Sequence, residues 1–246
     1  MFFFSKNKPV LKDLIPEGHV DIHSHLLTGI DDGARTFEDT LRLTQALQGF
    51  GVTHFITTPH IREHVWENTR EGIVSKKTET ILQFEKNNIK IPFHAAAEYF
   101  MDDQFVRLFE SHDLLTLKDN YVLVEMSYIN APIQLYSILF DLQLAGYIPV
   151  LAHPERYLFY HNNFNEYAKL KRAGCLFQLN LLSVVGYYGA QIAKVAEQLL
   201  AKGMYAYVGS DVHHDNHIAA FEQKVTLKDV TPLKEAIANN QFFKTK

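Results

Sequence analysis

Histidine is unusually frequent in this chain of 246 residues, and the positions of the histidines indicate metal chemistry. The chain has 13 of them, roughly twice ordinary usage. His23 and His25 lie in the segment DIHSH, and Asp211 and His213 lie in GSDVH. Residues i and i+2 of an extended strand point to the same side, so each pair could grip one cation.

Other imidazoles and carboxylates come at the ends of further short apolar runs. Together with the two pairs they give eight candidate ligands: His23, His25, His60, Glu98, Glu125, His153, Asp211 and His213. Asp32, in the loop after the first pair, is a ninth. One tetrahedral zinc ion takes four donors. The set therefore suits two or three divalent ions, with Glu98 and Asp211 as bridging carboxylates. Donors without thiolate fit Mn²⁺, Fe²⁺ or Zn²⁺.

Two arginines stand close to these candidate ligands. Such a metal cluster lowers the pKa of bound water and clamps the oxygens of a transferring phosphoryl group. Arg156 is three residues beyond His153, and Arg35 follows Asp32. The planar guanidinium binds phosphate through two parallel hydrogen bonds, so we predict that both arginines bind the phosphate of a substrate.

The apolar runs before these residues are rich in β-branched and aromatic side chains, as strands buried on both faces are. The pattern predicts seven strands, at residues 19–25, 53–60, 90–100, 121–128, 148–156, 176–183 and 206–213. Helical periodicity between them predicts seven helices, at residues 36–50, 68–88, 102–112, 132–145, 163–173, 188–202 and 232–240.

This alternation predicts an α/β fold of parallel βα units. We expect a closed or nearly closed barrel of seven strands, with an open doubly wound sheet as the alternative. In a barrel the carboxyl ends of the strands share one face, and six of the seven predicted strands bring a histidine or a carboxylate there. No linker divides the chain, so we expect one domain over residues 1–246, with residues 1–17 as an N-terminal strap.

Composition excludes several classes of protein. The 24 basic and 28 acidic residues give a net charge of −4. The chain therefore has no overall positive electrostatic field that would attract nucleic acid. No apolar run approaches the roughly 18 residues of a membrane span, and Phe2–Phe4 are too short a run for a secretory signal. A lone cysteine cannot form an intramolecular disulfide. We therefore expect a cytoplasmic protein.

That cysteine, Cys175, does not fit a cysteine-dependent phosphatase. Such an enzyme needs an arginine six residues after its cysteine, so that the arginine and backbone amides cradle the phosphate. Position 181 is Leu181, and Cys175 begins a predicted buried strand. We predict that Cys175 is not a nucleophile.

The ordered motifs DIHSH, IDDG, TTPH, AAAEY, the strand with Glu125, LAHPER and GSDVHH resemble the polymerase and histidinol phosphatase (PHP) superfamily. The resemblance runs from about residue 19 to residue 213 and is strongest to its manganese-dependent bacterial protein tyrosine phosphatases, encoded with capsule or exopolysaccharide genes. It implies a distorted (β/α)₇ barrel, related to the TIM barrel, that holds three metal ions.

The resemblance also implies roles for particular residues. The ligand positions of the family fall on the nine residues already named, and its phosphate-binding arginine is Arg156. Its members dephosphorylate a bacterial tyrosine kinase that controls polysaccharide export. Some members carry a second arginine after the last ligand motif, where this chain has residues 214–217, HDNH. We expect Asn216 or His217 to donate a hydrogen bond to the substrate instead.

We therefore predict a metal-dependent phosphatase in which metal-bound hydroxide attacks the phosphorus of phosphotyrosine, while Asp211 or a water protonates the leaving phenolate. Five aromatic residues at the rim either pack or form a wall for the phenyl ring: Tyr157, Phe159, Tyr160, Tyr187 and Tyr188. A small-molecule phosphatase or phosphodiesterase is the alternative on the same barrel, and a metal-stabilised scaffold without turnover is a third reading.

Overall fold

The computed structural model describes residues 8–244. Phe2–Phe4 lie outside the described residues, so the predicted N-terminal strap can be compared with the structure only from Lys8 onward. There the chain runs along residues 221–225, with the Leu11 N–H donating to the Gln223 carbonyl at 2.9 Å. Leu11 itself is fully buried. None of the helices in the described range is long and apolar enough to cross a membrane.

Within these residues the chain forms nine short strands in two parallel sheets. Their bounds are β1 His19–Asp21, β2 Val52–Thr57, β3 His60–Ile61, β4 Phe93–Ala95, β5 Glu98–Phe100, β6 Tyr121–Glu125, β7 Ile148–Ala152, β8 Leu176–Asn180 and β9 Tyr207–Gly209. One sheet has the order β1-β2-β4 and the other β3-β5-β6-β7-β8-β9. Every pairing between these strands is parallel.

Two of the predicted strands are broken. The expected strand at 53–60 is β2 followed by β3, and the one at 90–100 is β4 followed by β5. Pro59 lies at the first break, where its missing N–H cannot continue a ladder. Two backbone bonds still tie the broken strands together, from Ala96 N–H to the Thr57 carbonyl and from Glu98 N–H to the Pro59 carbonyl. Seven strand positions therefore remain, as predicted.

The edges of the two sheets meet between β1 and β9. Ser24 and Val212 form a parallel bridge just beyond these strands, and the His25 N–H donates to the Val212 carbonyl at 3.0 Å. Below this bridge, the buried Asn240 side chain accepts from the Val208 N–H at 3.1 Å and donates to the Val20 carbonyl at 2.9 Å. The parallel α/β class is confirmed, and these bonds join the edges as a distorted barrel requires.

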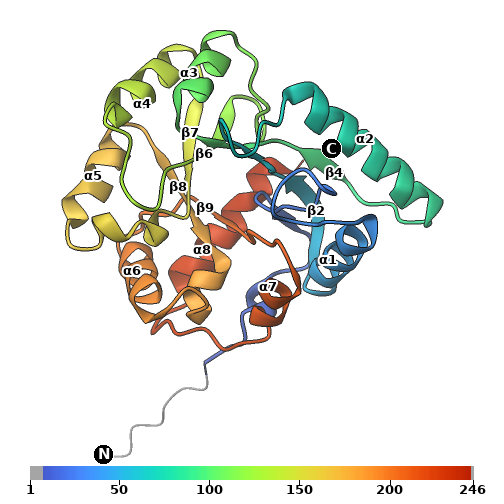
Figure 1. Ribbon diagram of the computed structural model, residues 1–246. Helices are drawn as coiled ribbons and strands as arrows, with labels where there is room; N and C mark the ends of the chain where they lie inside the picture. The colour runs from blue at the N-terminus through green and yellow to red at the C-terminus, as the bar shows by residue number, and fades with distance from the viewer. Residues whose placement is uncertain (1–7, 245–246) are drawn as a thin grey trace, which may run out of the picture.

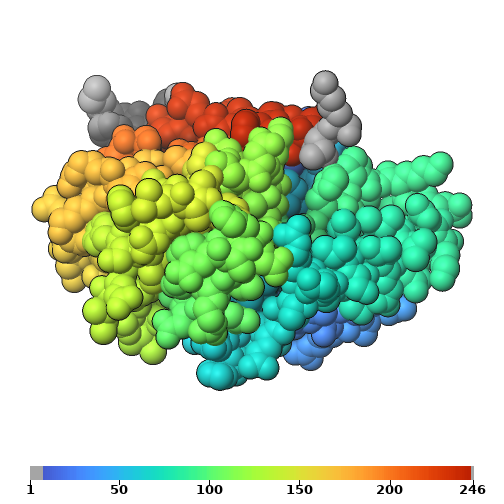
Figure 2. Space-filling view, turned by 90° about the horizontal axis from the view of Figure 1, so that it is seen from above, coloured from blue at the N-terminus to red at the C-terminus, as the bar shows by residue number. Residues whose placement is uncertain are grey.

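Helices surround the strands (Figure 1). Their bounds are α1 Phe37–Gly49, α2 Arg70–Lys86, α3 Asp103–Glu110, α4 Leu135–Leu144, α5 Phe164–Arg172, α6 Ala190–Ala201, α7 Asp215–Ala220 and α8 Thr231–Asn239. Thr36 and Asp39 form a reciprocal capping box at the start of α1. The sequence analysis missed α7. The red C-terminal segment lies along one edge of the molecule (Figure 2).

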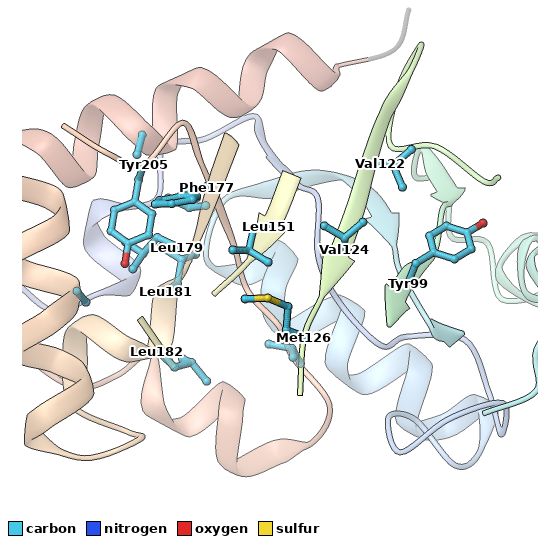
Figure 3. Close-up of a cluster of buried hydrophobic side chains, with 14 of the residues drawn as sticks. Tyr99, Val122, Val124, Met126, Leu151, Phe177, Leu179, Leu181, Leu182 and Tyr205 are labelled. Atoms are coloured by element: carbon cyan, nitrogen blue, oxygen red, sulfur yellow. The ribbon is translucent and has the colours of Figure 1, made fainter. Parts of the chain in front are cut away.

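The central strands are buried on both faces, which explains their continuous apolar sequences. Val122 and Val124 of β6 pack into one hydrophobic cluster with Leu151 and Phe177, and Figure 3 shows their side chains. Leu123, between the two valines, points the other way into a second cluster. This alternation leaves the strands rigid on both sides, so that their carboxyl ends can hold polar side chains in fixed positions.

We predict that Asn240→Ala lowers the free energy of unfolding by about 2–4 kcal/mol, because the buried Val208 N–H and Val20 carbonyl lose their partner. Urea denaturation followed by circular dichroism measures this. Asn239→Ala is the matched control, since the Asn239 amide is exposed and donates only to the Ala206 carbonyl. Equal losses in the two variants would show that Asn240 does not join the sheet edges.

Candidate functional site

The nine side chains predicted as metal ligands come together at the carboxyl ends of the strands, with Glu98 at their centre. Glu98 is fully buried at the start of β5. Its Oε2 atom lies 3.1 Å from His23 Nε2, 3.4 Å from His25 Nε2 and 3.2 Å from His60 Nδ1. Its Oε1 atom lies 3.1 Å from His153 Nε2. One carboxylate thus faces four imidazoles, and its two oxygens would help to hold divalent ions together with them.

The other three carboxylates join the same cluster. Asp211 Oδ1 is 3.2 Å from His23 Nε2, and Asp32 Oδ1 is 3.4 Å from His213 Nε2. Glu125 Oε1 is 3.1 Å from His60 Nδ1. The ligand atoms fall into four overlapping groups, each within 4.8 Å: His25 with Asp32, His60 and His213; His23 with Glu98 and His153; His23 with His25 and Asp211; and His60 with Glu98 and Glu125.

Three of the imidazoles are oriented by a partner on their other ring nitrogen. His23 Nδ1 lies 2.8 Å from Gln178 Oε1, and His25 Nδ1 lies 2.7 Å from Asp31 Oδ2. His213 Nδ1 lies 2.9 Å from the Asp211 carbonyl oxygen. Each of these contacts leaves Nε2 facing the centre, as the outer hydrogen bonds of metal-ligating histidines do.

Sequence analysis missed Gln178 and Asp31. A signal for Gln178 was present, because it is the one polar side chain inside the apolar run LFQL of β8. A glutamine in such a strand needs a hydrogen-bond partner. Asp31 is adjacent to the predicted ligand Asp32, and nothing in the sequence separates the two roles.

The cluster strongly favours positive charge. Burial lowers the pKa of His23, but the carboxylates of Glu98 and Asp211 outweigh burial and raise this pKa to about 10. Burial raises the pKa of Glu98, yet His23 and His60 hold it well below its usual range. Protons or divalent cations can supply this charge. Imidazole and carboxylate donors with anchored outer nitrogens fit divalent metal ions.

Two of the candidate ligands have left-handed backbone conformations, at φ 38° for His153 and φ 50° for Asp211. Non-glycine residues seldom adopt this conformation, which concentrates at functional sites. Hydrogen bonds hold both residues there. The His153 N–H donates to the Gln178 carbonyl at 2.8 Å, and the Asp211 N–H donates to the His23 carbonyl at 2.7 Å. The chain turns sharply at each residue and directs its side chain to the centre.

The segment between His153 and Arg156 is fixed by a buried carboxylate. Glu155 accepts hydrogen bonds from the Asn180 N–H at 3.0 Å, from Ser183 Oγ at 2.7 Å and from the Tyr205 hydroxyl at 2.9 Å. Burial raises the pKa of Glu155. The motif HPER therefore contains an anchor, Glu155, between a candidate ligand and a candidate phosphate binder.

A pocket of about 320 Å³ opens above the cluster. Arg156 lines it and donates from Nη1 to Asp211 Oδ2 at 2.9 Å. Its guanidinium lies 4.8 Å from the ring centroid of Tyr128 and 4.2 Å from that of Tyr188. The arginine predicted to bind phosphate is therefore held at the candidate ligands, with its planar group clamped between two rings.

Arg35 and His217, which the sequence analysis predicts to bind substrate, are not among the residues that line the pocket. Arg35 is exposed before α1 and does not line the pocket. His217 is buried against Tyr187, and its Nδ1 accepts the His213 N–H at 3.2 Å. Burial lowers the pKa of His217 to about 3. Its neutral ring thus positions the backbone of His213.

For the five aromatic residues at the predicted rim there were two alternatives, packing or a wall for the phenyl ring, and the structure favours packing. Tyr157 and Tyr160 are buried in the core, and none of the five lines the pocket. Trp66, Phe100 and Tyr128 line it instead. Sequence analysis placed the rim correctly but could not tell which aromatic side chains the loops turn inward.

We predict that Gly209→Ala weakens binding of divalent metal ions by about tenfold or more, because a displaced outer partner costs that much at a metal-ligating histidine. A Cβ atom on Gly209 would lie 2.5 Å from Cβ of His23 and 2.6 Å from Nε2 of Gln178. Equilibrium dialysis with metal analysis measures the affinity. Gly49→Ala is the control, since a Cβ there meets nothing within 4 Å. Unchanged affinity in Gly209→Ala would contradict this account of His23.

Comparison with known proteins gives consistent results. The family model for capsular polysaccharide synthesis, CpsB/CapC, matches residues 19–226. Tyrosine-protein phosphatase YwqE of Bacillus subtilis is 31% identical over 205 residues, covering 79% of this chain and 77% of the relative. Tyrosine-protein phosphatase CpsB of Streptococcus pneumoniae is 28% identical over 203 residues, covering 79% and 83%.

A solved structure agrees with the sequence comparisons. It comes from a study of YwqE from Bacillus subtilis and CpsB from Streptococcus pneumoniae, described as unique metal-dependent tyrosine phosphatases. It matches with a TM-score of 0.76 and 25% identity over 92% of this chain and 88% of that one. The resemblance to the capsule-linked phosphatases is therefore confirmed, and this chain belongs to the CpsB/CapC family of capsular polysaccharide synthesis proteins.

Proposed function

We propose that this protein is a metal-dependent protein tyrosine phosphatase. The observation that carries the proposal is the convergence of nine imidazole and carboxylate side chains, with Glu98 at their centre, beneath a pocket that Arg156 also lines. Relatives of high coverage bear the name tyrosine-protein phosphatase. We assign the nine residues as ligands of two or three divalent ions, with Mn²⁺ as the expected metal. When bound, these ions lower the pKa of water to give a nucleophile near neutral pH and neutralise phosphoryl oxygens.

Arg156 orients the phosphate in this proposal. Its hydrogen bond to Asp211 and its stacking on two tyrosines fix the guanidinium before the substrate arrives. A fixed group needs no reorganisation when negative charge develops on the phosphoryl oxygens in the transition state. Tyr128, which lies beside Arg156 in the pocket, provides apolar surface for the phenyl ring.

Asp211 acts better as a ligand than as an acid. Burial raises its pKa, but His23 and the other neighbouring imidazoles hold the pKa well below its usual range. Its Oδ2 atom also accepts from Asn180 Nδ2 at 2.7 Å. A carboxylate held ionised in this way has no proton to give, so we assign protonation of the leaving phenolate to water.

The substrate partner and cellular location extend the same proposal. A tyrosine-phosphorylated bacterial kinase that controls polysaccharide export is the expected substrate, because the family model is one of capsular polysaccharide synthesis. We place the protein in the cytoplasm, where such a kinase would present its phosphotyrosines. A small-molecule phosphatase or phosphodiesterase stays the alternative, and the first experiment below distinguishes it.

We expect protein stripped of metal by a chelator to be inactive on a phosphotyrosine peptide and Mn²⁺ to restore hydrolysis. Thiol alkylation should leave activity unchanged, because Cys175 is buried and burial raises its pKa to about 12. Phosphate release measures turnover. Metal uptake without hydrolysis of the peptide would contradict the phosphatase proposal, and hydrolysis of small phosphate esters or diesters alone would support the alternative.

We expect Arg156→Ala to lower kcat/KM for the same peptide about 100-fold, since a lost charge-assisted contact to the transition state costs about 3 kcal/mol. Steady-state kinetics with the Mn²⁺-loaded protein test this. Arg42→Ala is the matched control, because Arg42 pairs with Asp39 and Asp215 on the surface. Full activity of Arg156→Ala would remove this residue from the mechanism.

A further inference from the structure

A second arginine lines the pocket, and neither the sequence motifs nor the mechanism above uses it. Arg62 lies in the turn after β3, together with Trp66. The Arg62 N–H donates to the Trp66 carbonyl at 3.0 Å, and the Trp66 N–H donates back to the Arg62 carbonyl at 2.9 Å. The Glu63 N–H also donates to Asp102 Oδ2 at 3.1 Å. The turn is therefore held in place from both sides.

The charge of Arg62 has no acidic partner among residues 8–244. Its guanidinium carbon lies 4.2 Å from the ring centroid of Phe100, and the ion pairs of the described residues do not include it. The adjacent Glu63 pairs with Arg107 instead, at 2.7 Å. An exposed guanidinium stacked on an aromatic ring remains free to bind an oxyanion through two hydrogen bonds.

Arg62 and Arg156 reach the pocket from different walls. Arg62 follows β3 and Arg156 follows β7, and β5 and β6 lie between these strands in the sheet. Phe100, which supports Arg62, is two residues beyond Glu98 on β5. In the ladder between β5 and β6, Phe100 pairs with the candidate ligand Glu125, so Phe100 is level with the edge of the ligand cluster. The Arg62 side chain is exposed, whereas Arg156 is half-buried and contacts Asp211. Arg62 therefore lies nearer the mouth of the pocket.

We propose that Arg62, Phe100 and Trp66 form a subsite for a second anionic group of the substrate, outside the phosphate that is cleaved. The group is an oxyanion near the phosphotyrosine, either an Asp or Glu carboxylate or a further phosphoryl group. This subsite rests on the proposed function, since it reads the peptide around the phosphotyrosine. It gives a chain of net charge −4 a local attraction for acidic peptides.

The test compares kcat/KM for four substrates of the Mn²⁺-loaded protein. Three are phosphotyrosine peptides, flanked by serine, by aspartate or by a second phosphotyrosine, and the fourth is para-nitrophenyl phosphate. We expect one or both anionic peptides to exceed the serine peptide about five- to tenfold, as a partly exposed bidentate contact allows. Aspartate and phosphotyrosine then distinguish a carboxylate from a phosphoryl group as the occupant.

Arg62→Gln should abolish this preference. Arg62→Glu is assayed in addition with a lysine-flanked phosphotyrosine peptide, which it should prefer to the anionic peptides. The ratio of kcat/KM for the anionic peptide to that for para-nitrophenyl phosphate should fall five- to tenfold in Arg62→Gln. Arg42→Gln, a surface arginine paired with Asp39 and Asp215, is the matched control and should keep the wild-type ratio.

Three results would overturn the subsite. Wild-type protein that hydrolyses all three peptides equally leaves the phosphatase function intact and removes the subsite. An equal loss on all four substrates in Arg62→Gln assigns Arg62 to the cleaved phosphate itself. Wild-type protein that hydrolyses no phosphotyrosine peptide refutes the proposed function, and the subsite fails with it.

Discussion

The structure depends on the balance of charge around one buried carboxylate, Glu98. An ionised carboxylate is costly to remove from water unless opposite charge and hydrogen bonds replace the solvent. Glu98 meets this requirement through four imidazoles, which come from the segment after β1, the first residue of β3 and the residue after β7. These elements are remote in sequence. The same arrangement that makes Glu98 tolerable in the interior therefore brings together the donor set of a metal centre.

Rigidity around this centre comes from apolar packing and from polar anchors below and beside it. The strands are buried on both faces, so their carboxyl ends move little relative to one another. Gln178, Asp31 and Glu155 then fix individual side chains or short segments. A reactive centre needs positions accurate to a fraction of an ångström, and these anchors supply that accuracy where the strands end.

The sequence was sufficient to predict the fold class, the seven strand positions and the nine residues that converge, because each of these depends on local pattern. Apolar runs mark strands, and parallel strands bring their carboxyl ends to one face. The breaks at Pro59 and after Ala95 were not predicted, since apolar content continues across them. Loop residues were the least predictable. The sequence favoured Arg35 and His217 as substrate contacts, whereas the fold turns Arg62 and Trp66 into the pocket.

The contact between the two sheet edges, at β1 and β9, has a consequence for biosynthesis. His23 and His25 emerge from the ribosome early, but Asp211 and His213, which complete their environment, are made almost two hundred residues later. Asn240, whose side chain hydrogen-bonds to both sheet edges, is made later still. A chain made from its N-terminus therefore exposes an incomplete and strongly charged donor set throughout translation. The donor set can therefore reach its final geometry only after the last helix has docked.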